Sequence, residues 1–164
     1  MSALRDGPVE LDADVASDDP LFRGLDFNLA QPVHISGRLT EAGSSQVYWR
    51  GRIRAQLNET CRRCLEPVTV AATAEVDALF SDSQIADDPS VYASGARPGE
   101  LYLGDAVREE LLLAVPGYVL CQEDCRGLCP ECGANRNTER CNCAPQVDRR
   151  WAGLEALKGG LSEE

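Results

Sequence analysis

The sequence predicts an α+β protein, in which an antiparallel β-sheet or partly closed barrel packs against one or two helices and is followed by a C-terminal cysteine-rich module. Three observations support this prediction. Apolar and polar residues alternate over three long stretches between residues 33 and 80, which is the period of half-buried strands. One helical pattern follows near residues 105 to 115. Six of the eight cysteines lie after that pattern.

The first 30 residues form an acidic segment that contains Pro8 and Pro20. Because proline interrupts helices and central strands, most of this segment is expected to be irregular. One short opening strand is predicted near Val9 to Val15, among acidic side chains.

Three longer strands are predicted in the central part of the chain. The first begins at Val33 and alternates up to Thr40, after which residues 41–45 are expected to form a turn. The second covers residues 47–57, and the third covers residues 68–80. Since their connections are short, these strands are expected to form an antiparallel meander.

A loop and then a helix are predicted after the strands. Residues 81–99 are polar, acidic and interrupted by proline and glycine, which predicts a long mobile loop. Asp105 is placed to cap a helix that runs to Val115 and ends before Pro116. The apolar stripe of this helix comprises Val107, Leu111 and Val115, widened by Leu112 and Ala114.

The chain is therefore expected to have four parts. These are the acidic segment 1–30, the sheet and helix core 31–120 with its acidic loop 81–99, the cysteine-rich module 121–147, and a C-terminal helix and tail 148–164. The cysteine-rich module has almost no large apolar side chains, so burial alone cannot fold it. The predicted C-terminal helix has Asp148 as its N-cap and Trp151, Leu154 and Leu157 on one face.

Composition limits the classes of protein to which the chain can belong. Its 164 residues allow one compact domain with a small satellite module, and 43% of them are apolar. The net charge of −11 argues against a protein that wraps nucleic acid over its whole surface, because phosphate neutralisation needs a basic footprint. No apolar stretch is long enough for a membrane span and no secretion signal is visible, so a cytoplasmic location away from membranes is expected.

The eight cysteines stand in four close pairs, and this spacing indicates metal binding in a reducing compartment. A tetrahedral zinc site needs four thiolates that converge on one point, so eight cysteines can form two complete structural sites. Glycines at positions 127 and 133 provide tight backbone turns beside them. The pairs are Cys61 and Cys64, Cys121 and Cys125, Cys129 and Cys132, and Cys141 and Cys143.

Chain geometry favours one division of these ligands. The last four cysteines lie within one short segment and can close a site by themselves. Cys61 and Cys64, at a turn between strands, would then join Cys121 and Cys125 just after the helix. Such a site would attach the sheet to the C-terminal module. A crossed arrangement is the alternative.

Other cysteine chemistries fit the pattern less well. Disulfides would require export, and a redox pair typically opens a helix in a βαβ unit, whereas these pairs lie in turns of an antiparallel layout. Catalytic zinc keeps one coordination position for water, which two complete sets of four cysteines do not leave. The zinc deaminase signature also fails, at His34 and at Cys129 to Cys132. An iron–sulfur cluster stays open as an alternative, since four cysteines can hold one.

Arginines are concentrated in one part of an acidic chain. Residues 46–66 carry a local charge of +3 and residues 121–150 are balanced, so by difference the remainder carries −14. The strand predicted at residues 47–57 presents its arginines on one face, which suits contacts with phosphate or an acidic partner. An ordinary solvated surface, or compensation of thiolate charge, is the alternative. The candidate partner-binding residues are Tyr48, Arg50, Arg52, Arg54, Arg62 and Arg63.

Three blocks are specific in their order and spacing: CRRCLEP at residues 61–67, VREELLLAVP at 107–116 and CRGLCPECG at 125–133. With them the chain, from about residue 30 to residue 158, resembles the bacterial YceD family of large ribosomal RNA subunit accumulation proteins. The last block departs slightly, with Asp148-Arg149-Arg150 in place of Asp-Pro-Arg and no ligand lost. The resemblance implies a role in making or accumulating large-subunit ribosomal RNA. It implies no known catalytic activity, and the family's gene often lies beside that of a small basic large-subunit ribosomal protein.

Two functions are therefore expected as alternatives. The first is a non-enzymatic ribosome-biogenesis factor that supports synthesis, processing or accumulation of 23S ribosomal RNA, with two structural zincs holding a docking surface for that RNA or a pre-50S particle. The second is an acidic chaperone or adaptor for a small basic ribosomal protein. An enzyme with a small-molecule substrate is not expected. The single histidine, His34, lies on a predicted strand, and the carboxylates Asp105, Glu109 and Glu110 suit the start of a helix.

Overall fold

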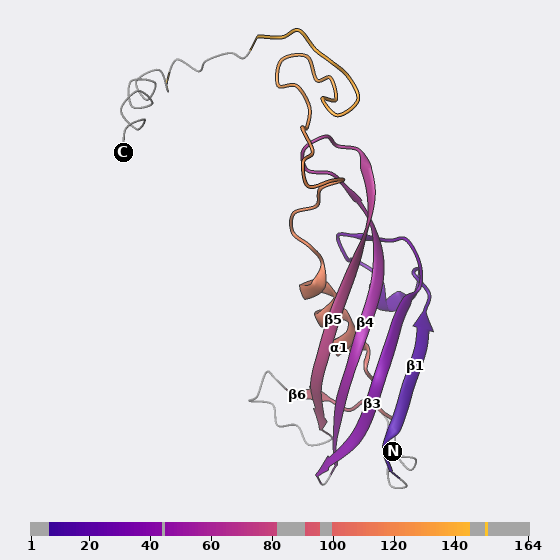
Figure 1. Ribbon diagram of the computed structural model, residues 1–164. Coiled ribbons are helices and arrows are strands. Elements are labelled where there is room, and N and C mark those ends of the chain that lie inside the picture. The colour runs from indigo at the N-terminus through magenta and orange to yellow at the C-terminus, as the bar shows by residue number, and fades with distance from the viewer. Residues whose placement is uncertain (1–6, 44, 82–90, 96–99, 145–149, 151–164) are drawn as a thin grey trace, which may run out of the picture.

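The computed structural model describes residues 7–43, 45–81, 91–95, 100–144 and 150. Within these ranges the chain forms a curled sheet with one α-helix (Figure 1). No helix in this part of the chain is long and apolar enough to cross a membrane. The elements are β1 (Val9–Val15), the 3-10 helix η2 (Pro20–Phe22), β2 (Asn28–Leu29), β3 (Val33–Gly43), β4 (Gln46–Thr60), β5 (Pro67–Ser81), β6 (Val91–Ala93) and α1 (Gly104–Ala114).

The strand order is β1, β3, β4, β5, β6, and the short β2 pairs with β4 beyond the start of β3. Strands β1, β3, β4 and β5 are antiparallel to their neighbours, whereas β6 runs parallel to β5. The predicted meander of three long strands is therefore confirmed, as is the short opening strand at Val9–Val15.

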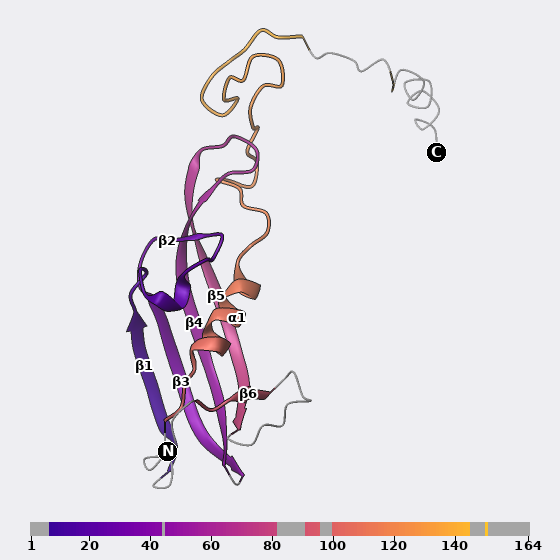
Figure 2. The ribbon, with the colours of Figure 1, turned by 180° about the vertical axis from the view of Figure 1, so that it is seen from behind.

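One face of the sheet carries the core. Along β4 the side chains alternate strictly: Trp49, Ile53 and Leu57 are fully buried, whereas the even-numbered residues between them are exposed. Helix α1 covers this face beside β5, and η2 lies on the same side (Figure 2). Arg108 of α1 donates a 2.6 Å hydrogen bond to the carbonyl of Leu21, which ties the helix to η2. The residues of α1 that are buried on the sheet are Gly104, Ala106, Val107 and Leu111.

The helix differs from its prediction at both its start and its buried face. It begins at Gly104 because the backbone of Leu103 is already helical, so Asp105 lies in the first turn and is not the cap. A carboxylate in the first turn still favours the helix through the macrodipole. Leu112 is 47% exposed, so it does not widen the buried stripe.

Some residues predicted to form the turn before β4 and the loop after β5 are strand instead. Strand β3 continues to Gly43 through a register shift, so the expected turn at residues 41–45 is partly strand. The predicted loop 81–99 contains β6, since Tyr92 packs its ring against Phe80 with the centroids 5.4 Å apart. The predicted C-terminal helix at residues 148–158 lies outside the described residues apart from Arg150. The division of the chain at residues 30, 120 and 147 stays a prediction.

Candidate metal centres

The first cysteine pair lies at the tip of the β4–β5 hairpin, which extends beyond the other strands (Figure 1). The turn is closed by hydrogen bonds from Leu65 N to Cys61 O and from Cys61 N to Glu66 O, both 2.9 Å long. Leu65 adopts a left-handed backbone conformation with φ of 61°, which allows the chain to reverse direction in this tight turn. The side chains of Cys61 and Cys64 are both buried.

The segment after α1 returns along this hairpin tip and is joined to it by main-chain hydrogen bonds. Arg62 N donates to Val119 O at 2.9 Å, and Leu128 N donates to Arg63 O at 3.0 Å. Gly127 has φ of 69°, and a Cβ there would lie 2.8 Å from Arg63 O, so only glycine allows this close approach. The result is that Cys121 and Cys125 lie beside the hairpin cysteines.

The first tetrad, defined as Cys61, Cys64, Cys121 and Cys125, has the dimensions of a tetrahedral thiolate site. All four Sγ atoms lie within 4.8 Å of one another. The Sγ atoms of Cys61 and Cys125 are 3.7 Å apart, and those of Cys64 and Cys121 are 3.6 Å apart. Bonds of about 2.3 Å to a central zinc give sulfur–sulfur edges of about 3.8 Å, whereas a disulfide needs about 2.05 Å. The tetrad therefore fits a zinc ion.

The second tetrad lies in the loop beyond the first and comprises Cys129, Cys132, Cys141 and Cys143, whose Sγ atoms also lie within 4.8 Å of one another. Its first turn is closed by hydrogen bonds from Gly133 N to Cys129 O at 2.9 Å and from Cys129 N to Ala134 O at 2.8 Å. Gly133 has φ of 73°, as expected for a glycine-dependent turn. The structure thus groups the cysteines in the division that chain geometry favours, and both groups can hold a metal ion.

The thiols of each tetrad do not share one ionisation behaviour. Burial raises the pKa of Cys61, but backbone hydrogen bonds at Cys64 and Cys121 outweigh it and lower that pKa to about 6. Desolvation by burial, together with hydrogen bonding to the other thiols of the tetrad, raises the pKa of Cys121 to about 12. In the second tetrad backbone hydrogen bonds lower the pKa of Cys129 to about 6, while hydrogen bonding to Cys132 and Cys129 raises that of Cys143 to about 12. A divalent cation is what allows all four thiolates of a set to coexist.

Groups outside the ligands hold the first tetrad in place. Arg63 Nη1 donates to Cys125 O at 2.9 Å, and Asn137 Nδ2 donates to Cys125 Sγ at 3.3 Å. Asn135 accepts from Asn137 and donates to Glu66 at 3.3 Å, which joins the hairpin tip to the C-terminal loop. Such outer contacts orient ligands and tune metal affinity. No role was predicted for either asparagine, although their place between Cys132 and Cys141 is visible in the sequence.

The predicted arginine face of β4 exists, but its charges are largely offset. Arg50 Nε lies 2.8 Å from Asp77 Oδ1, and Arg52 pairs with Glu75 at 2.6 Å. Hydrogen bonds from Tyr48 and Arg50 hold the pKa of Asp77 below its ordinary value. The two acids lie on β5 directly opposite the arginines. Their place on the outer face follows from the alternation along β5, which is visible in the sequence. Arg54 lies opposite the uncharged Thr73, and Arg62 is exposed at the hairpin tip.

Two of the candidate acid and base groups, His34 and Glu109, are bonded to nearby structural partners. His34 Nδ1 lies 2.9 Å from Asp14 Oδ1, across the β1–β3 pair. Glu109 accepts a 2.9 Å hydrogen bond from the hydroxyl of Tyr92. Both contacts join neighbouring elements of the fold.

Comparison with known proteins places the chain in a family. The family model described as "Large ribosomal RNA subunit accumulation protein YceD" matches residues 49–158, from within β4 through all eight cysteines. The chain belongs to the YceD family. The resemblance seen in the three sequence blocks is therefore confirmed.

Curated relatives of this YceD protein occur in bacteria and plants. Uncharacterized proteins of Mycobacterium tuberculosis and Mycobacterium bovis are each 30% identical over 126 residues, covering 75% of this chain and 61% of theirs. A Zea mays protein named "Large ribosomal RNA subunit accumulation protein YCED homolog 1, chloroplastic" is 24% identical over 189 residues, covering 89% of this chain and 63% of its own. The chain thus spans less than two thirds of the length of these relatives. No solved structure matches it.

Proposed function

We propose that this YceD protein is a non-enzymatic ribosome-biogenesis factor that supports the accumulation of large-subunit (23S) ribosomal RNA. The observation that carries the proposal is that the region shared with the family contains the hairpin tip, α1 and both cysteine tetrads. The names of the family and of the maize relative refer to accumulation of this RNA. A cytoplasmic location suits that role.

Both tetrads are proposed to be structural zinc sites. Four thiolates fill every position of a tetrahedral ion and leave none for a water molecule, so the expected contribution of zinc is folding energy and rigidity. Zinc at the first tetrad would fix the segment after α1 to the β4–β5 hairpin. Zinc at the second would fold residues 129–143, a segment with few large apolar side chains.

The partner is proposed to be large-subunit ribosomal RNA or a pre-50S particle. Among the residues predicted to contact it, Arg54 and Arg62 are exposed and have no charged partner in the described part of the chain. Arg63 supports Cys125 instead. Carboxylates of β5 already bind the polar groups of Tyr48, Arg50 and Arg52. These three residues are therefore less suited to bind phosphate.

Depletion tests this function directly. Cells of the source organism that lose the protein should show a lower ratio of 23S to 16S ribosomal RNA, and the intact gene should restore it. Restoration should fail with Cys61→Ser/Cys64→Ser, which removes half of the first tetrad. An unchanged RNA ratio after depletion would contradict the proposal.

A second candidate function rests on acidic residues of the edge strand β1. Glu10, Asp12 and Asp14 are exposed along it. Glu10 pairs with Arg38 at 2.6 Å, and His34 lies 2.9 Å from Asp14 and 3.9 Å from Asp12. An acidic edge suits a chaperone or adaptor for a small basic ribosomal protein. Pull-down from a nuclease-treated lysate separates the two candidates, because a protein partner survives the treatment whereas RNA-mediated partners are lost.

A further inference from the structure

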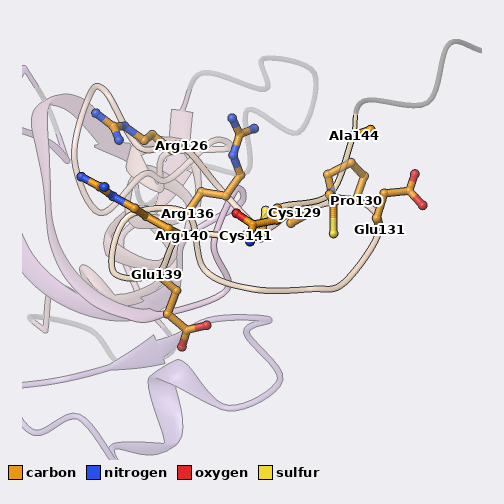
Figure 3. Close-up of a pocket in the computed structure, with 11 residues that line it drawn as sticks. Arg126, Cys129, Pro130, Glu131, Arg136, Glu139, Arg140, Cys141 and Ala144 are labelled. Carbon is orange, nitrogen blue, oxygen red and sulfur yellow. The ribbon is translucent and has the colours of Figure 1, made fainter.

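Three arginines line a cavity of about 400 Å³, whose wall also includes three cysteines of the second tetrad. Arg126 follows the last ligand of the first tetrad, whereas Arg136 and Arg140 lie between the ligands of the second. Figure 3 shows the guanidinium groups of Arg126 and Arg140 extending to one side of this cavity, with that of Arg136 above the same loop. The carboxylates of Glu131 and Glu139 point in other directions. We call these three arginines the module triad.

The module triad is available to a ligand, unlike the arginines of β4. All three side chains are exposed. Among the described residues, none forms an ion pair or side-chain hydrogen bond with their guanidinium groups, whereas Arg50 and Arg52 are paired with β5 carboxylates. An unpaired guanidinium can bind an anion without first breaking an ion pair with a carboxylate.

The backbone of the module triad is held in place before any ligand arrives. Arg126 N donates to Asn137 Oδ1 at 2.8 Å, and Arg136 N donates to Gly127 O at 2.9 Å. Because Gly127 also lies against Arg63 O, this network connects the triad to the hairpin tip. Preorganised donors lose less entropy on binding than donors on a free loop.

The triad could serve merely as counter-charge to the thiolates, since a zinc tetrathiolate carries about −2. Counter-ions of that kind gain most when they lie against the sulfur atoms. The side chains of Arg126 and Arg140 instead extend away from Cys129 and Cys141 (Figure 3). Their charges are therefore directed toward solvent, where a partner can meet them.

We propose that the module triad binds phosphate groups of the RNA backbone, an inference that rests on the proposed function and assigns its principal contact to the second zinc module. Guanidinium groups bind phosphate through two parallel hydrogen bonds. None of the described residues that line the cavity is aromatic, so none of them offers a face on which a base could stack. The ligand is thus the phosphodiester backbone, and the contact positions the RNA without reading its sequence.

Binding of full-length, zinc-loaded protein to 23S RNA transcribed in vitro tests the proposal. The variant Arg126→Ala/Arg136→Ala/Arg140→Ala should bind about tenfold more weakly or worse near 150 mM salt. Its slope of log affinity against log salt should be shallower by about 2, since each lost phosphate contact removes about 0.7 to 0.9. The matched control is Arg38→Ala/Arg50→Ala/Arg52→Ala, which removes the same charge from arginines that are already paired with carboxylates and should keep most of the slope.

Equal losses in the two variants would mean that net charge alone matters and would overturn the proposal, as would an unchanged affinity of the triad variant. Native mass spectrometry must show two zincs in both variants. A second measurement avoids variants altogether: RNA should protect Arg126, Arg136 and Arg140 of the wild-type protein from phenylglyoxal, and absence of protection would overturn the assignment. Protection by inorganic pyrophosphate without any binding of 23S RNA would uphold a phosphate site and refute the proposed RNA contact.

Discussion

Asn137, which lies between ligands of the second tetrad, donates its side-chain amide to the Sγ of Cys125 in the first tetrad at 3.3 Å. The same asparagine accepts from Arg126 N and is oriented by the carbonyl oxygen of the Asn135 side chain, 2.9 Å from its amide nitrogen. A hydrogen bond to a thiolate stabilises its charged form and so favours metal binding. The two tetrads are therefore connected by the side chain of Asn137 as well as by the polypeptide backbone.

Asn137→Ala should weaken zinc binding at the first tetrad by about 10- to 100-fold, the usual effect of removing an outer hydrogen bond to a ligand. Chelator competition measures this affinity, and the second tetrad provides an internal reference. Asn142→Ala is the matched control, because Asn142 is exposed in the same loop and is followed by Cys143. Equal zinc affinities for the two variants would show that the contact with Cys125 does not matter.

The two arginines inside the first motif are expected to behave differently. Arg63 Nη1 holds Cys125 O at 2.9 Å, and its guanidinium also interacts with Tyr118, which raises the pKa of Arg63. Arg62 uses only its backbone, through the hydrogen bond from its N–H to Val119 O. Arg63→Ala should therefore lower zinc affinity at the first tetrad by about tenfold or more, whereas Arg62→Ala should leave it unchanged. A larger effect of Arg62→Ala in the same chelator assay would contradict this assignment.

Much of the site could be predicted because its determinants are local. Period-two alternation over residues 47–57 is enough to place Trp49 inside and Arg50 outside. The last four cysteines lie so close in sequence that they can form one group independently of the rest of the chain. Cys61 and Cys64 are then expected to group with Cys121 and Cys125. Such groupings can therefore be predicted from the short spacing in the sequence, without knowledge of the tertiary structure.

Other features depend on tertiary contacts that no pattern in the sequence specifies. The register between β4 and β5 decides that Arg50 meets Asp77, so the arginine face looked more basic in the sequence than it is. Strand β6 has three residues and forms where Tyr92 meets Phe80. The module triad was hidden because its segment is neutral overall, and only the fold separates its arginines from its carboxylates.

Zinc binding should release more protons as the pH falls. In the metal-free protein the pKa of Cys61 is lowered to about 6, so this thiol is ionised near pH 7.5 and is protonated below about pH 6. The pKa of Cys121 is raised to about 12, so its proton must leave at either pH. Because zinc binds thiolates, each retained proton opposes binding, and affinity falls toward acid pH. Calorimetry in buffers of different ionisation enthalpy counts these protons, and a count that is independent of pH would contradict the assignment.

The indole of Trp49 lies over the glycine pair Gly37 and Gly51, which face each other across β3 and β4. A Cβ at Gly51 would collide with the Trp49 indole nitrogen and with the carbonyl of Ser36, and Trp49 is fully buried, so neither neighbour has room to move. Gly51→Ala should therefore lower the free energy of unfolding by about 1–3 kcal/mol, the range for overpacking a core. Gly117→Ala is the control, since a Cβ there meets nothing within 4 Å. Urea denaturation followed by far-UV circular dichroism measures both variants, because fluorescence would report Trp49 and Trp151 together. Equal midpoints would mean that the strands separate enough to admit the methyl group, and that the close packing of Trp49 contributes little to the stability of the sheet that carries the first tetrad.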